Sequence, residues 1–146
     1  QEMVAILLAW AWVVEVVQAF CPPGCTCGDL PPVARCVGVG VNMVPILFNP
    51  RLRRLNMAHN AISSVGGSLV FLDKLEELDF SYNLITILNK GDFEAQSRVR
   101  ELRLSHNNMT SIAPGAFQGL KSLRVLDLSH NNLADFQQVY WMTFHS

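Results

Sequence analysis

LDLSHNNL, residues 126–133, is the fourth appearance of one phrase in this chain. The earlier copies read LNMAHNAI (55–62), LDFSYNLI (78–85) and LRLSHNNM (102–109). The asparagines that close the pattern are 23, 24 and 24 residues apart, and a leading apolar residue keeps the same spacing. Such repetition at one interval predicts a stack of similar structural units. The asparagines are Asn60, Asn83, Asn107 and Asn131, and the leading residues are Leu52, Leu75, Val99 and Leu123.

The repeated pattern is L-x-x-L-x-L-x-x-N, and on it the chain resembles the extracellular leucine-rich-repeat family over roughly residues 20–136. Leu-x-Leu alternation is typical of a strand with one buried face. The segments that return between strands are too short for long helices. The resemblance therefore implies an α/β repeat solenoid dominated by β-structure, with a short curved parallel sheet and an irregular convex side.

Two further sets of residues recur with the strands. An asparagine amide both donates and accepts hydrogen bonds, so the four asparagines are expected to form a structural ladder that satisfies each turn. Three phenylalanines precede the next strand, and we predict that they plug the outer side of each coil: Phe71, Phe93 and Phe117. A second apolar set follows each turn: Ile62, Val65, Ile85, Leu88, Met109, Ile112, Leu133 and Phe136.

An apolar leader precedes the repeats. MVAILLAWAWVV (3–14) is followed by Glu15 and by a small residue at Ala19. This pattern predicts a signal peptide over residues 1–19, and hence an extracellular or cell-surface protein. An uncleaved signal-anchor is the alternative, because residues 3–20 approach the length that spans a bilayer.

Charge and composition argue against several functions. Removal of the leader deletes Glu2 and Glu15 and changes the formal net charge from −1 to +1. A near-neutral domain without a basic face is not drawn to nucleic acid. Gly38-Val39-Gly40 lacks the third glycine of a dinucleotide-binding loop, and the repeat assembles no Ser/His/Asp set. We therefore expect neither an enzyme nor a cofactor.

All four cysteines lie between the leader and the first full repeat, with the spacing C-x3-C-x-C-x8-C. Four cysteines allow three pairings, and spacing alone does not choose among them. Zinc ligation is an alternative, but behind a signal sequence an oxidising compartment favours disulfides. The stretch also resembles the N-terminal cysteine cap of extracellular leucine-rich-repeat proteins, which implies the pairs Cys21–Cys27 and Cys25–Cys36. In this cap, Val37, Val39 and Val41, followed by Val44-Pro45, are expected to supply a starting strand and turn.

These patterns divide the chain into four parts. The leader (1–19) is followed by a cysteine-rich cap (20–50), four repeats (51–136) and an apolar tail (137–146). The tail contains no second cysteine cap, so we interpret it as a truncated or atypical end through which the protein could associate. A membrane anchor, if present, is expected outside this stretch.

The spacer residues of each strand are expected to face outward onto the concave surface, with neighbours about 4.8 Å apart. Alternating charge in one column favours a self-satisfied surface ladder, whereas the like charges of Glu77 and Glu101 favour an acidic centre for a basic partner. The columns are Arg54/Glu77/Glu101/Val125, Asn56/Asp79/Arg103/Asp127 and Ala58/Ser81/Ser105/Ser129. The candidate binding residues are Arg54, Glu77, Asp79, Glu101, Arg103 and Asp127.

The position before each asparagine carries a ring: His59, Tyr82, His106 and His130. Two histidines and a carboxylate can hold zinc, but Tyr82 interrupts the column and the repeat places no third ligand, so no metal is expected. An exposed position that tolerates polar rings is the simpler interpretation.

Asn108-Met109-Thr110 is an N-glycosylation acceptor sequence, and an exposed turn next to Asn107 favours its use. Together the patterns predict a secreted or cell-surface module that recognises an extracellular protein ligand or receptor through its concave face. The alternative is a structural component that organises the extracellular matrix.

Overall fold

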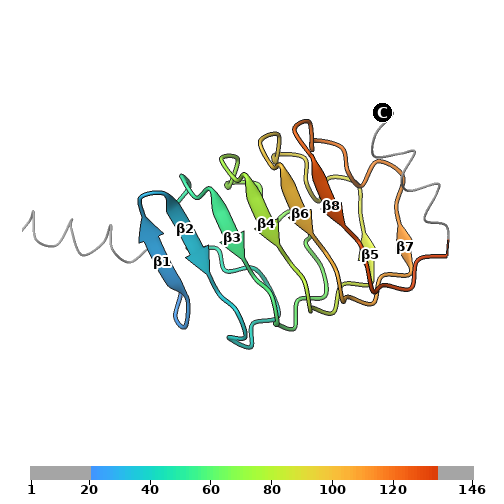
Figure 1. The fold of residues 1–146 in the computed structure, drawn as a ribbon, viewed down its shortest axis with the longest axis horizontal. Coiled ribbons are helices and arrows are strands. Elements are labelled where there is room, and N and C mark those ends of the chain that lie inside the picture. Colours follow the sequence, from blue (N-terminus) through green and yellow to red (C-terminus); the bar gives the residue numbers. More distant parts are fainter. Residues whose placement is uncertain (1–20, 135–146) are drawn as a thin grey trace, which may run out of the picture.

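The repeats wind into a solenoid of about four coils. The structure, a computed structural model, describes residues 21–134. Each of the four coils contributes one strand to a six-stranded sheet, and the N-terminal cap contributes the other two. The order is β1-β2-β3-β4-β6-β8, and Figure 1 shows these strands side by side along the long axis. The repeat solenoid expected from the sequence is confirmed.

Four strands carry the Leu-x-Leu pattern: β3 (Arg54–Asn56), β4 (Glu77–Asp79), β6 (Glu101–Arg103) and β8 (Val125–Asp127). They pair in parallel and in register, so the central leucines of successive strands are neighbours. Leu55 and Leu78 are 2% exposed and Leu102 is fully buried, which stabilises the fold by about 1.5–3 kcal/mol per side chain. One repeat period therefore equals one coil, and residues at the same place in the repeat become neighbours.

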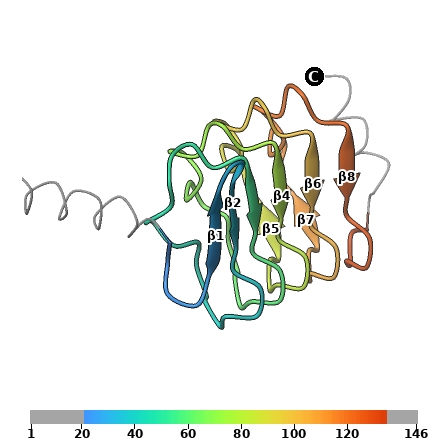
Figure 2. The same cartoon turned by 60° about the vertical axis from the view of Figure 1, so that its left-hand side comes forward.

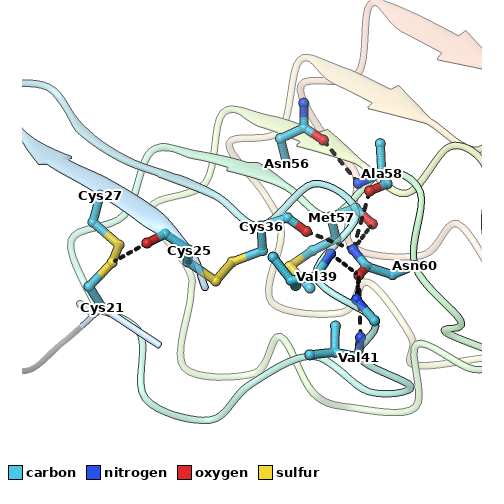
Figure 3. The surroundings of a disulfide bond; sticks show 11 residues. Cys21, Cys25, Cys27, Cys36, Val39, Val41, Asn56, Met57, Ala58 and Asn60 are labelled. Carbon is cyan, nitrogen blue, oxygen red and sulfur yellow. Dashed lines mark hydrogen bonds between the residues drawn. A yellow bond between two sulfur atoms is a disulfide. The ribbon is translucent and has the colours of Figure 1, made fainter. Parts of the chain in front are cut away.

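The N-terminal cap is an antiparallel hairpin of β1 (Thr26–Asp29) and β2 (Pro32–Arg35). Cys25 precedes β1 and Cys36 follows β2, so their disulfide closes the open end of the hairpin. A second disulfide joins Cys21 to Cys27 (Figure 3). These are the two pairings that the family resemblance implies. β2 then pairs in parallel with β3 and extends the sheet beyond the first coil.

The cap strand that begins the parallel sheet is β2, which lies earlier in the chain than the strand predicted at Val37, Val39 and Val41. The chain leaves the sheet at Cys36, and residues 37–39 form a turn in which Gly38 has a φ of 65°. Main-chain N–H groups of this turn donate to the side chain of Asn60, which holds it away from the strand direction. The alternation of valines is therefore not a strand signal here. Val44, in contrast, is buried in the core.

The convex side is built from turns and one small parallel sheet. This sheet pairs β5 (Ile87–Leu88) with β7 (Ser111–Ile112). Neither strand is hydrogen-bonded to the six-stranded sheet, and both are labelled in Figure 2. Residues 21–134 contain no helix, so the expected dominance of β-structure is confirmed and the helical part of the α/β class is absent from this stretch.

The plug on the outer side of each coil is Leu69, Phe93 and Phe117, all of them buried. Phe71 was expected at the first of these places, but it is 81% exposed. The expectation was wrong by two positions, because the steps from Leu69 to Phe93 and Phe117 keep the period while the step from Phe71 does not. The second apolar set is buried or partly buried from Ile62 to Leu133, and Phe136 lies outside the described residues.

The asparagine side chains bridge neighbouring coils. Asn83 Nδ2 donates to the carbonyl of Phe80 in its own coil and to that of Met57 in the preceding one, while its Oδ1 accepts from the N–H of Ile62. Asn60, Asn107 and Asn131 repeat this arrangement, and Figure 3 shows Asn60 joined to the cap. Each amide thus satisfies turn groups that have no ladder partner.

Candidate functional site

The predicted binding residues lie in two columns on the concave face. Arg54 is in register with Glu77, and Glu77 with Glu101. The second column places Asp79 beside Arg103, and Arg103 beside Asp127. A cavity of about 300 Å³, hereafter the concave groove, lies over β2, β3, β4 and β6. Its charged lining is Arg35, Arg54, Glu77, Asp79, Glu101 and Arg103.

Two differences from the predicted set stand out. Asp127 does not line the groove, whereas Arg35 of the cap does. Arg35 is in register with Asn56 and begins the second column. Sequence reasoning missed it because the cap strand was expected after Cys36, so Arg35 had no place in the sheet.

The charges of the groove are largely paired. Arg54 Nε lies 3.2 Å from Glu77 Oε1 across the strands, and Arg103 Nη2 lies 3.0 Å from Glu101 Oε2 within β6. The hydrogen bond to Glu101 raises the pKa of Arg103. The centre is therefore balanced by two ion pairs rather than acidic, and the closeness of Glu77 and Glu101 is tolerated because each carboxylate has an arginine.

The column of alternating charge does not form the expected ladder of ion pairs. Asp79 and Asp127 instead use Oδ1 to accept hydrogen bonds from the main-chain N–H groups of Ser81 and Ser129, at 2.8 and 3.0 Å. Asn56 does the same for the N–H of Ala58 at 2.9 Å. These side chains fix the chain as it leaves the strand, in the way that Asx side chains fix turns.

Asp127 receives a further hydrogen bond. Ser129 Oγ donates to its Oδ1 at 2.6 Å. This bond is the main reason that the pKa of Asp127 is lowered from its ordinary value of 3.8. Because the folded-state pKa is depressed, the stabilisation is present above that ordinary value and is lost as pH falls through the lowered pKa.

The third column contributes little accessible surface. Ala58, Ser81 and Ser105 are 7–8% exposed, although they were expected to face outward with the other spacers. The strands have ended at this point, and the small side chains pack between coils, with Ser105 Oγ 3.1 Å from Ser81 Oγ. Ser129 alone of this column is exposed among residues 21–134.

The ring residues form one continuous stack along the edge of the sheet. His59, Tyr82, His106 and His130 have successive ring centroids 4.2, 4.2 and 4.1 Å apart and nearly parallel planes. Tyr82 was expected to interrupt the column, but it does not, because a tyrosine ring stacks as well as an imidazole. All four residues have φ between 53° and 58°, a left-handed conformation that aims each ring at the next.

This stack is poorly suited to a metal. Rings that face one another turn their nitrogen atoms to parallel edges rather than toward a common point. Within residues 21–134 no group of three or more His, Cys, Asp or Glu side chains is close enough to hold a metal ion.

Asn108 lies on an exposed turn beside the asparagine ladder. Its Oδ1 accepts a hydrogen bond of 2.7 Å from Nδ2 of Asn132 in the next coil. Thr110, the third residue of the acceptor sequence, is also exposed. The proposed glycan would therefore project from the edge where the turns leave the sheet.

Several predictions concern residues outside 21–134: the leader (1–19) and the apolar tail (137–146). Among the residues that the structure does describe, no helix is long and apolar enough to cross a membrane.

Sequence comparison identifies the family. The Leucine rich repeat profile matches residues 50–109 and 97–141, which together exceed half of the chain, and the chain belongs to this family. A mouse protein, leucine-rich repeat, immunoglobulin-like domain and transmembrane domain-containing protein 2, is 31% identical over 62% of this chain and 17% of its own length. Zebrafish leucine-rich repeat-containing protein 3B is 34% identical over 50% of this chain and 40% of its own length.

Solved structures with the same coil arrangement include human 5T4, also called Wnt-activated inhibitory factor 1 or trophoblast glycoprotein. It superposes with a TM-score of 0.75 at 25% identity, over 86% of this chain and 48% of its own. TLR13 in complex with ssRNA13 superposes with a TM-score of 0.65 at 31% identity, over 71% of this chain and 15% of its own. The chain thus spans less than half the length of each of these proteins.

Family and fold define the coarse function. Leucine-rich-repeat domains are typically protein-interaction modules rather than enzymes. The TLR13 complex contains RNA, so the ligands of this fold are not confined to proteins. The two disulfides of the cap are typical of an extracellular setting.

Proposed function

We propose that this protein is a secreted or cell-surface recognition module that binds a protein partner in the concave groove. The observation that supports this most directly is the groove itself, which gathers three arginines and three carboxylates on the rigid sheet. Side chains held by strands present a fixed pattern of charge, which favours specific recognition.

The partner is expected to match a balanced pattern rather than a uniformly acidic one. Arg54 and Arg103 are engaged by glutamates, whereas Arg35 and Asp79 form no ion pair within the described residues. Asp79 lines the groove, its Oδ1 accepts a hydrogen bond from the N–H of Ser81, and its Oδ2 makes no hydrogen bond within residues 21–134. A partner that places a cation near Asp79 and an anion near Arg35 would complement both groups.

Charge reversal at the centre of the groove tests this function. The variant Glu77→Lys/Glu101→Lys replaces two anions that face Arg54 and Arg103 with cations, so partner affinity is expected to fall at least tenfold, about 1.4 kcal/mol. The measurement is binding of the secreted chain to a library of cell-surface and secreted ectodomains, followed by affinity measurement on each hit.

Two controls separate binding from folding. Asp73→Lys/Glu94→Lys makes the same change of charge at exposed positions outside the groove lining and is expected to bind normally. Glu77→Gln/Glu101→Gln removes the charges without adding repulsion, and its melting temperature reports any loss of fold. Equal affinity of the reversed and wild-type proteins would show that the groove is only structural.

The compartment is tested by intact mass, reduced and unreduced, after expression through a eukaryotic secretory pathway. A secreted chain that begins at Phe20, has no free thiols and carries a glycan on Asn108 is the expected product. Retention in the cell with the leader intact would favour the signal-anchor. If the Asn108→Gln variant carries the same glycan mass as the wild type, Asn108 is not the glycosylation site.

A further inference from the structure

In the other three coils, the residue at the place equivalent to Arg103 makes a hydrogen bond that stabilises the fold. Asn56, Asp79 and Asp127 each accept a hydrogen bond from the main-chain N–H two residues later, at 2.8–3.0 Å. A guanidinium has donors only, so Arg103 cannot do this. The N–H of Ser105 accordingly has no protein acceptor within residues 21–134, although Ser105 is 8% exposed.

The interactions of Arg103 within the fold do not compensate for the missing hydrogen bond to the N–H of Ser105. A ladder across the sheet would join it to Asp79 and Asp127, but no such ion pair forms among the described residues. Its one ion pair is with Glu101 in the same strand, and the Arg103 side chain is 50% exposed. Exposed ion pairs of this kind contribute about 0–1 kcal/mol.

We infer that Arg103 is a specificity-determining residue of the concave groove and that its guanidinium receives a carboxylate of the partner. This inference rests on the proposed function and names one feature of the partner. Nη2 donates to Glu101, and the other guanidinium nitrogens, Nε and Nη1, make no hydrogen bond to residues 21–134. A guanidinium with free donors in a groove binds a carboxylate through two parallel hydrogen bonds, which an uncharged or cationic side chain cannot replace.

A comparison of two substitutions tests whether the fold needs Arg103. Arg103→Asn removes one arginine and one ion pair but supplies the acceptor that the other coils have. Arg54→Asn also removes one arginine and one ion pair from the groove, at a column where no such hydrogen bond is made. We expect Arg103→Asn to melt about 2–6 °C above Arg54→Asn, the effect of one hydrogen bond in a domain of this size. A melting temperature at or below that of Arg54→Asn would mean that Arg103 serves the fold, and would overturn the inference.

A display library of random peptides about twelve residues long tests the partner chemistry. The library is selected in parallel on the wild-type chain, Arg103→Asn and Arg103→Glu. We expect peptides selected by the wild type to be enriched in Asp or Glu at one position, the enrichment to disappear with Arg103→Asn, and Lys or Arg to replace it with Arg103→Glu. The same enrichment on all three proteins would overturn the inference and leave the proposed function standing. Failure of the wild-type chain to select any peptide above background would overturn both.

Discussion

At the scale of the residue, one asparagine side chain per coil makes hydrogen bonds to several main-chain groups. Asn107 accepts from the N–H of Ile85 and donates to the carbonyls of Phe80, Leu104 and Ser105. No other side chain of similar size offers a donor and an acceptor that can point in opposite directions along the stack. The ladder is therefore a property of the side-chain chemistry and not merely of its position.

Replacement of the Asn107 amide should leave main-chain N–H and carbonyl groups that it contacts without hydrogen-bond partners. We expect Asn107→Ala to lower the free energy of unfolding by about 1–3 kcal/mol, because buried turn groups lose their partners. The measurement is a denaturant titration. Asn89→Ala is the control, since Asn89 is exposed and its side chain makes no hydrogen bond within residues 21–134, and it should change stability by less than about 0.5 kcal/mol. Equal losses would mean that the Asn107 bonds add nothing to folding.

The stacked rings illustrate a local strain that neighbours offset. A left-handed conformation costs a residue with a Cβ about 1–2 kcal/mol. His106 adopts it with a φ of 54°, and contacts Tyr82 and His130 on its two faces. Stacking contributes about 0.5–1.5 kcal/mol per aromatic pair, which is of the same order. Rings at this position thus stabilise a conformation that glycine, as at Gly38 of the cap, adopts without cost.

At the scale of the element, the convex turns pack backbone against backbone. Gly119 has a φ of 101°, and a Cβ there would lie 2.7 Å from the Cα of Glu94 in the preceding coil. The turn therefore approaches its neighbour more closely than any other residue type permits.

Gly119→Ala should force these two turns apart. We expect a loss of about 2–4 kcal/mol, since both steric overlap and an unfavourable φ are introduced. Gly40→Ala is the matched control, because Gly40 has a φ of 78° and no atom within 4 Å of an added Cβ, so it reports the conformational cost alone, about 1 kcal/mol. Thermal melts of the two variants measure the difference. A Gly119→Ala protein as stable as Gly40→Ala would contradict close packing of the turns.

Elements that repeat could be predicted from the sequence, and elements that occur once could not. Leu55, Leu78 and Leu102 share one place in the period, so their register follows from the spacing alone. The cap hairpin contains Gly28 and Pro31, residues that usually mark loops, and it is closed by the Cys25–Cys36 disulfide rather than by strand propensity. The residue types of the cap therefore led to a wrong prediction of where its strands lie.

The candidate site was predictable as a set of neighbours but not as a set of contacts. Register places Arg103 between Asp79 and Asp127, as expected, yet rotamers decide that it pairs with Glu101. The aspartates are diverted to main-chain N–H groups, and the recurring D-x-S at 79–81 and 127–129 was the sequence signal for this. Spacing fixes which side chains can meet, whereas competing hydrogen-bond partners decide which do.

At the scale of the whole molecule, each coil touches only its neighbours, so stability is a sum of coils and the interfaces between them. The cap is the N-terminal neighbour of the first coil, and it buries Ala34 and Cys36 against the stack. Loss of the cap should therefore affect the first coil directly and the later coils only through it.

Removal of the Cys25–Cys36 disulfide should be the costlier of the two cysteine deletions. We expect Cys25→Ser/Cys36→Ser to lose about 2–5 kcal/mol, because this bridge closes the hairpin and Cys36 is fully buried. Cys21→Ser/Cys27→Ser opens a shorter loop, with a sequence separation of 6 against 11, at more exposed residues, and should lose less. Denaturant unfolding of both variants compares them, and a larger loss for the second pair would contradict the role given to the hairpin closure.

The disulfide-closed hairpin also has a mechanical consequence. Under tension applied along the chain, each released coil adds the length of one repeat, about 80 Å at roughly 3.4 Å per residue. The residues between Cys25 and Cys36 add nothing, because the covalent bridge carries the load past them. A tether attached at the N-terminal side would therefore pull on an inextensible clamp, while the coils behind it yield in even steps.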